Sequence, residues 1–106
     1  KILEFCNKNS LKNKNLQGKI ECKLEFSNNW GLGSSSTLLN NLSSLYEINP
    51  YDLHFSTTNG SGYDIACAGS NSALTYQVLE NIPEVKKINW SPIFKDEILF
   101  IFLKKK

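Results

Sequence analysis

The hydrophobic positions of this chain change their period along its length. Residues 18–26 read GKIECKLEF, in which apolar and charged side chains alternate. This period of two is typical of a half-buried strand and is the clearest strand pattern in the sequence. Residues 2–12 instead space their apolar side chains in a way closer to a helix, so a helix is expected there.

Two more helices are predicted in the middle of the chain. Apolar side chains recur at helical spacing from Leu38 to Tyr46, with asparagines and serines on the opposite face. Asn49 then precedes Pro50, which pairs an N-cap residue with a proline at the first helical position. A short helix is therefore expected to run to about Thr57.

The C-terminal third predicts strands. SALTYQVL at 72–79 and EVKKINW at 84–90 are separated by a turn near Asn81 to Glu84. EILFIFL at 97–103 is apolar throughout, which is typical of a strand that is buried on both faces. This order of elements predicts an α+β fold in which a sheet packs against helices.

Composition narrows the class of protein. A chain of 106 residues with 41% hydrophobic and 21% charged residues fits one globular domain. The net charge is only +2 and the sequence contains no arginine, so no nucleic-acid partner is expected. The longest apolar run, Ile98 to Leu103, is far shorter than the roughly 20 residues that span a bilayer. No membrane partner is expected either.

The three cysteines are odd in number and far apart in the sequence. Neither a disulfide framework nor a zinc site is expected from such spacing, and a cytoplasmic location fits best. Cys22 and Cys67 are interpreted as small core residues, and the single histidine, His54, as a surface residue.

A glycine- and serine-rich stretch, NNWGLGSSSTLLNNL at 28–42, joins the predicted strand to the predicted helix. The free backbone N–H groups and the dipole of a helix N-terminus favour an anion such as phosphate. The alternative is a turn in which Ser34 or Ser35 only caps the helix. A Walker loop is excluded because the next lysine after the glycines is Lys86.

A second glycine motif, Ser61-Gly62-Tyr63-Asp64, follows further along the chain. GLGSSST after CKLEF, together with SGYD, resembles the GHMP kinases, and most closely their mevalonate kinase-like bacterial members. The resemblance covers nearly the whole chain. It implies that residues 1–106 are part of an ATP-binding N-terminal domain, of a fold also found in a ribosomal protein, without the family's C-terminal domain.

The resemblance also implies roles for single residues. Asp64 is expected to be the catalytic acid/base, and Ser35 a ligand of Mg²⁺. The ATP phosphates would lie on the loop formed by Gly31, Leu32, Gly33, Ser34, Ser35 and Ser36. The partners would be ATP and a small-molecule substrate, such as mevalonate or phosphomevalonate, that accepts the phosphoryl group.

Two positions depart from the family pattern. Ser27 replaces the proline that opens the first motif, and Leu53 stands where a metal-binding glutamate is expected, with Asp52 or Glu47 as substitutes. The family's phosphate-neutralising lysine and third glycine motif lie outside these residues, so the fragment alone is expected to be inactive. A non-catalytic binding domain that keeps the fold is the alternative. The acceptor substrate and the oligomeric state stay open.

Overall fold

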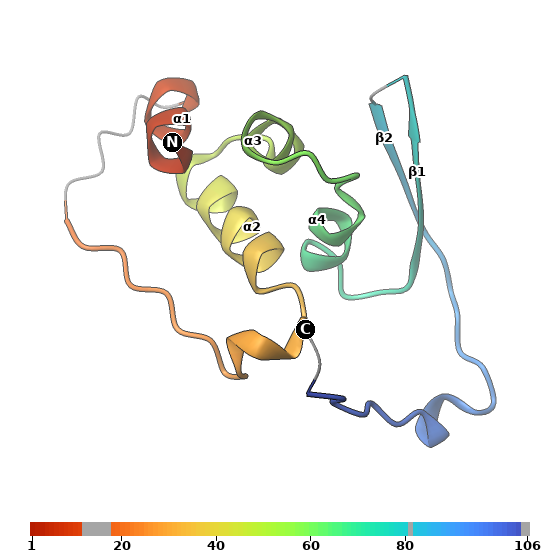
Figure 1. The fold of residues 1–106 in the computed structure, drawn as a ribbon. Coiled ribbons are helices and arrows are strands. Elements are labelled where there is room, and N and C mark those ends of the chain that lie inside the picture. The colour runs from red at the N-terminus through yellow and green to blue at the C-terminus, as the bar shows by residue number, and fades with distance from the viewer. Residues whose placement is uncertain (12–17, 81, 105–106) are drawn as a thin grey trace.

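The computed structural model describes residues 1–11, 18–80 and 82–104. In chain order its elements are α1 (Ile2–Asn9), the 3-10 turn η1 (Asn28–Trp30), α2 (Ser34–Tyr46), α3 (Pro50–Thr57), α4 (Tyr63–Ala68), β1 (Leu74–Leu79), β2 (Ile82–Lys87) and the 3-10 turn η2 (Lys95–Glu97) (Figure 1). The described residues form an α+β structure, as the sequence predicts.

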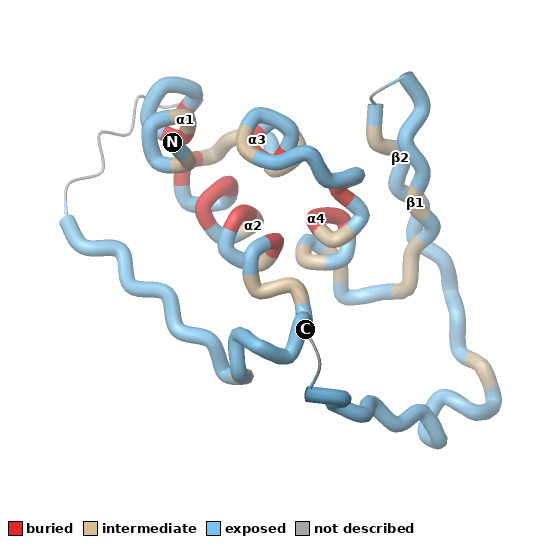
Figure 2. Tube along the Cα trace, viewed as in Figure 1, coloured by how far each residue is buried: buried red, intermediate tan, exposed pale blue. Residues whose placement is uncertain are grey.

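The core lies among the helices. α2 packs against α1, α3 and α4, because its apolar stripe faces all three. Figure 2 shows the buried residues gathered in these helices, whereas the hairpin of β1 and β2 and the C-terminal arm, residues 88–104, are exposed or half-buried. The main cluster of buried side chains consists of Cys6, Leu39, Leu42, Tyr46, Leu53 and Ile65.

Local sequence signals set the junction between α2 and α3. The chain leaves α2 through Glu47 in the left-handed region, at φ 56°, and the Ile48 N–H donates to the Ser43 carbonyl at 3.0 Å. The Asn49 side chain then accepts a 2.8 Å hydrogen bond from the Tyr51 N–H, and Pro50 occupies the first turn. The predicted helix from residue 50 to 57 is therefore confirmed.

The N-terminal helix is also confirmed, over Ile2–Asn9. Residue 12, where the predicted helix ends, lies outside the described residues. The helix is joined to the core at its end, because the buried Ser10 hydroxyl donates a 2.9 Å hydrogen bond to the Tyr46 carbonyl.

The hairpin of β1 and β2 is antiparallel, with its register running from Leu74 opposite Lys87 to Leu79 opposite Ile82. The second strand begins two residues before the predicted range 84–90 and ends before its last three residues. Residue 81 of the predicted turn lies outside the described part of the chain. β1 contacts α4, so the sheet packs against a helix on one side.

Two predicted strands are wrong. Residues 18–26 form no strand, and Ile20 is 43% exposed although its alternating pattern predicts burial. Residues 97–103 likewise form no strand, and Phe100 is 87% exposed. The physical reason is the same in both cases: a strand is stabilised by a neighbouring strand, and none pairs with either segment among the described residues.

Three residue-level predictions also need correction. Cys22 and Cys67 are exposed rather than part of the core, because Cys22 lies on the unpaired segment and Cys67 lies on a face of α4 that borders an open hollow. His54 is buried at 5% exposure rather than at the surface, because it turns inward from α3 toward the second glycine loop. Helix α4 itself is not predicted, since its six residues are too few to display a helical period. No helix in the described ranges is long and apolar enough to cross a membrane.

Candidate functional site

The first glycine loop leads from η1 into α2 through two left-handed residues. Gly31 has φ 69° and Gly33, the N-cap of α2, has φ 75°. Side chains other than glycine rarely adopt these angles, which explains both glycines. Ser27, at the position of the family's proline, caps η1 instead, and its hydroxyl accepts from the Asn29 N–H at 3.4 Å.

Gly33 has a second reason to be glycine. A Cβ atom at this position would lie 2.9 Å from the Ser36 Oγ, closer than real contacts allow. The Ser36 hydroxyl donates to the Gly33 carbonyl at 2.8 Å, and the Thr37 hydroxyl donates to the same oxygen at 3.0 Å. Both hydroxyls thus tie the start of α2 to its own cap, and each keeps its oxygen as a possible acceptor.

The second glycine loop ends in α4. Gly62 is the N-cap of this helix at φ 83°, and Asp64 lies in its first turn, half-buried. One carboxylate oxygen of Asp64 accepts a hydrogen bond from the Ile65 N–H at 3.1 Å. The other oxygen is not engaged by any described residue and can accept from a ligand.

The structure brings the two glycine motifs together at one hollow of about 450 Å³ between the start of α2 and α4. Its lining comes from two segments: Gly31, Leu32, Gly33, Ser36 and Thr37 on one side, and Tyr63, Asp64, Cys67 and Ala68 on the other. The predicted phosphate loop and the predicted catalytic aspartate are therefore neighbours, although they are far apart in the sequence. Tyr63 and Cys67 were not predicted, because the faces of α4 cannot be assigned without knowing that it is a helix.

Ser34 and Ser35 point elsewhere. The Ser34 hydroxyl donates a 2.7 Å hydrogen bond to the Asn28 side-chain oxygen, and Ser35 is exposed. Both line a different hollow, of about 750 Å³, that lies between α2 and residues 21–24. The structure thus separates Ser35, the predicted metal ligand, from the hollow that contains Asp64.

Residues from two other elements hold the second glycine loop. His54 Nε2 lies 3.1 Å from the Gly60 carbonyl oxygen, and the Tyr76 hydroxyl donates to the Ser61 carbonyl at 2.6 Å. Burial, together with the negative charge of Asp64, raises the pKa of the Tyr76 phenol above its ordinary value. The carboxylate of Asp64 therefore interacts electrostatically with the Tyr76 phenol.

The donor set for a metal ion is sparse. No group of three or more His, Cys, Asp or Glu residues in the described ranges is arranged to hold one. The Leu53 side chain is fully buried in the core, so position 53 is not a place from which a side chain could bind a metal ion in the hollow. Glu47 follows the last turn of α2, about 20 Å along the helix from Ser34, and Asp52 is exposed on α3. Neither residue lines the hollow beside Asp64.

A third hollow, of about 910 Å³, lies beside the first glycine loop. It is formed by residues 28–32 and by residues 100–103 of the C-terminal arm. The rings of Trp30 and Phe102 are 6.3 Å apart between centroids. The arm thus returns to the entrance of the glycine loop, a contact that no local sequence pattern indicates.

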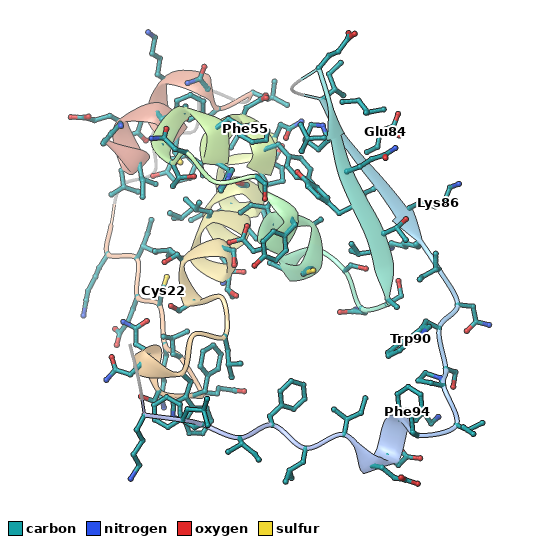
Figure 3. All side chains as sticks on the ribbon, turned by 45° about the vertical axis from the view of Figure 1, so that its right-hand side comes forward. Cys22, Phe55, Glu84, Lys86, Trp90 and Phe94 are labelled. Carbon is teal, nitrogen blue, oxygen red and sulfur yellow. The ribbon has the colours of Figure 1, made fainter. Side chains whose placement is uncertain are left out.

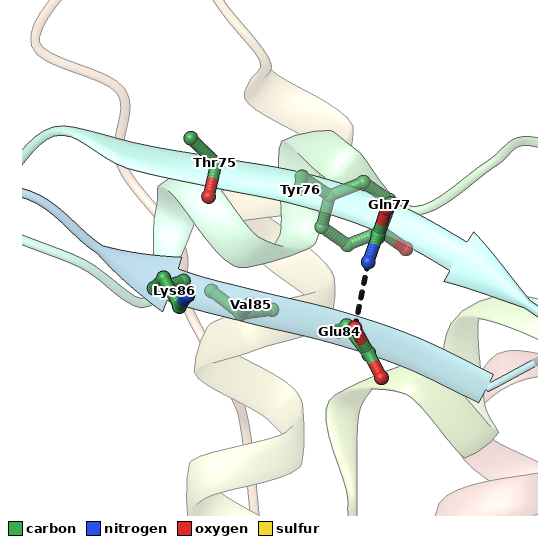
Figure 4. A pocket seen from close by; sticks show the side chains of 6 residues that line it. All are labelled: Thr75, Tyr76, Gln77, Glu84, Val85 and Lys86. Carbon is green, nitrogen blue, oxygen red and sulfur yellow. Dashed lines mark hydrogen bonds between the residues drawn. The ribbon is translucent and has the colours of Figure 1, made fainter.

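The hairpin carries a shallow hollow of about 370 Å³ (Figure 4). Its most prominent polar pair spans the two strands, since the Gln77 side-chain amide donates to a Glu84 carboxylate oxygen at 2.7 Å. These residues face each other in the strand register, so the contact stabilises the hairpin itself.

The described residues define a small α+β structure in which both glycine motifs line one hollow at the start of α2. No family model matches this chain, no curated protein is significantly similar to it, and no solved structure shares its fold at a significant level.

Proposed function

We propose that this chain is the nucleotide-binding part of an ATP-dependent small-molecule kinase related to the GHMP kinases. The observation that carries the proposal is the shared hollow: Gly31, Leu32, Gly33 and Ser36 of the GLGSSS loop line it together with Asp64. The finer fold assignment, a partial GHMP N-terminal domain, is part of the same proposal.

The residues of the hollow suit different parts of the ligand. The N-terminus of α2, with Gly31 and Gly33 leaving the backbone uncovered, is suited to phosphate oxygens. Asp64 has one carboxylate oxygen available to accept the proton of a substrate hydroxyl. Catalysis would then depend on positioning and charge neutralisation, as phosphoryl transfer generally does.

Magnesium fits these residues only in part. ATP is bound in cells with Mg²⁺, which neutralises phosphate charge and is held mainly by the phosphates with one or two protein oxygens. Among the described residues, Asp64 is the one carboxylate that lines the hollow, and Ser35 lines the neighbouring hollow. We propose that Asp64 rather than Ser35 lies near the ion.

Calorimetric titration with MgATP tests the proposal. Wild type is expected to bind, and Gly33→Val is expected to lose at least tenfold in affinity, because its side chain would fill the cap of α2. Gly69→Ala is the matched control, since an added Cβ there meets nothing closer than 3.5 Å. Asp64→Asn should weaken MgATP binding less than Gly33→Val does and, once an acceptor is known, should abolish transfer.

A well-folded wild type that does not bind MgATP would refute the kinase proposal. It would favour the second candidate, a non-catalytic binding domain. Three observations favour that candidate: Leu53 is a core residue, the Ser36 and Thr37 hydroxyls bond their own cap, and no clustered metal donors occur in the described ranges.

A further inference from the structure

Residues 19–25 run as an extended segment beside α2 and are not paired with any strand of the described chain (Figure 1). Their backbone N–H and C=O groups make no hydrogen bond within the described residues. The Lys19 Nζ lies 3.2 Å from a Glu21 carboxylate oxygen, so these alternate charged side chains reach the same side of the segment. The segment therefore has the geometry of an edge strand that lacks a neighbour.

The charges of this segment are complementary to those of a second copy of itself. The sequence KIECKLE is centred on Cys22, with Glu21 and Lys23 on either side of it and Lys19 and Glu25 further out. In an antiparallel pair centred on Cys22, Glu21 of one copy faces Lys23 of the other, and Lys19 faces Glu25. Opposite charges that face each other directly across two strands are stabilising, and like charges are destabilising.

The apolar residues match in the same register. Ile20 of one copy faces Leu24 of the other, and the two Cys22 residues face each other. With a two-fold axis between the two Cys22 residues, the apolar side chains of both copies lie on the same side of the two paired strands. The hollow beside this segment also contains Leu38 and Leu45 of α2, which are 37% and 39% exposed and can cover that side.

The exposed surface is large enough to accommodate a second copy. The protein exposes 8868 Å², whereas a compact monomer of 12.0 kDa exposes about 6,000 Å². Its radius of gyration is 16.0 Å, against about 13 Å for a compact domain of this length. The difference in surface is larger than the roughly 800 Å² that each partner contributes to a standard interface.

From these observations we propose that the protein forms a two-fold symmetric dimer in which residues 19–25 of two copies pair as antiparallel strands centred on Cys22. None of these residues lines the hollow that contains Asp64, so the dimer and the proposed kinase activity can fail independently.

Cross-linking through Cys22 tests the register. Residues directly opposite in an antiparallel pair have Cα atoms about 4.5 or 5.5 Å apart, and both distances allow a disulfide. In a Cys6→Ser/Cys67→Ser background, diamide should oxidise two Cys22 thiols to one disulfide, with two electrons and two protons passing to the diamide. A disulfide-linked dimer is expected at low micromolar protein, and Cys22→Ser should abolish it.

Charge reversal tests the complementarity without any covalent bond. Lys23→Glu places two glutamates opposite each other on both sides of the Cys22 pair and should weaken dimerisation by roughly tenfold in sedimentation equilibrium. The swap Glu21→Lys/Lys23→Glu restores opposite charges and should recover the dimer. Lys86→Glu, on the hairpin at the opposite side of the molecule from Cys22, is the matched control for net charge and should leave dimerisation unchanged (Figure 3).

Other outcomes overturn the proposal. A folded wild type that stays monomeric at all concentrations tested would refute the dimer proposal. A dimer that resists Lys23→Glu and does not cross-link through Cys22 uses another surface, such as the apolar residues 98–103. Loss of the dimer in Lys86→Glu but not in Lys23→Glu would assign it to the hairpin edge.

Discussion

The Tyr76 hydroxyl donates a 2.6 Å hydrogen bond to the carbonyl oxygen of Ser61, and this bond joins β1 to the loop that precedes Asp64. His54, from α3, contacts the carbonyl oxygen of the preceding residue, Gly60, at 3.1 Å. Two successive carbonyl groups of the loop are thus held from different elements. The position of Asp64 therefore depends on residues that lie outside both glycine motifs.

Removing the phenol oxygen of Tyr76 should loosen this loop. Tyr76→Phe deletes the bond to Ser61 and is expected to lower the free energy of unfolding by about 0.5–1.5 kcal/mol. Urea denaturation followed by circular dichroism measures the change. Tyr63→Phe is the control, because the Tyr63 hydroxyl bonds no described residue and its side chain is 61% exposed. Equal effects of the two variants would mean that the Ser61 bond adds nothing to stability.

Truncating His54 should cost more. His54→Ala removes a buried ring together with its contacts to Gly60 and Thr58, and a loss of about 2–4 kcal/mol is expected. Phe55→Ala, one residue further along α3 and 40% exposed, should cost clearly less although Phe has the larger side chain. The same denaturation experiment compares them. A larger loss for Phe55→Ala would contradict the role given to His54.

The two glycines of the first loop should differ in their tolerance of a methyl group. Gly31→Ala introduces only backbone strain at φ 69°, because nothing lies within 4 Å of the added Cβ. The free energy of unfolding is expected to fall by about 1–2 kcal/mol. Gly33→Ala adds to similar strain a contact of 2.9 Å with the Ser36 Oγ and should destabilise further. Thermal unfolding of both variants separates strain from crowding. Identical losses would show that Ser36 simply rotates away.

Stability should fall at alkaline pH. Burial raises the pKa of Tyr51 and of Tyr76 from the ordinary 10.0, and neighbouring negative charge adds to both. Because the folded state holds these protons more tightly, their contribution is full below pH 10 and is lost as the pH rises through the raised values. Burial raises the pKa of the Cys6 thiol from 9.0 in the same direction. The decline should therefore begin near pH 9.

Urea midpoints between pH 8 and pH 11 measure this decline. The double variant Tyr51→Phe/Tyr76→Phe should show a shallower fall with pH than wild type, even though it is less stable at pH 8. A fall of the same steepness in both proteins would mean that these phenols do not control the alkaline transition.

Helices could be predicted from the sequence where local chemistry determines them. The cap formed by Asn49 and Pro50 defines the start of α3, and the apolar spacing of Leu39, Leu42 and Tyr46 defines the buried face of α2. These signals act within a few residues of each other, so they can be recognised without knowledge of the fold. The short α4 carries no such period and was missed.

Strand formation could not be predicted equally well, because it depends on a partner. Residues 74–79 find one in the hairpin, whereas the regular alternation at 18–26 and the apolar run at 97–103 find none in the described chain. The exposure of Cys22 follows directly from this. The candidate site could be predicted only in part. The glycine motifs can be recognised in the sequence, but their meeting at one hollow and the separation of Ser35 from Asp64 depend on how the helices pack.

Helices α1 to α4, which enclose the core, follow one another along the first two-thirds of the chain, and the hairpin comes after them. A chain emerging from the ribosome would expose all of this helical core, including both glycine loops, before the second strand emerges. Helix contacts between segments close in sequence form quickly. The Tyr76 bond to Ser61 would then be a late addition that fastens a loop whose neighbours have already folded.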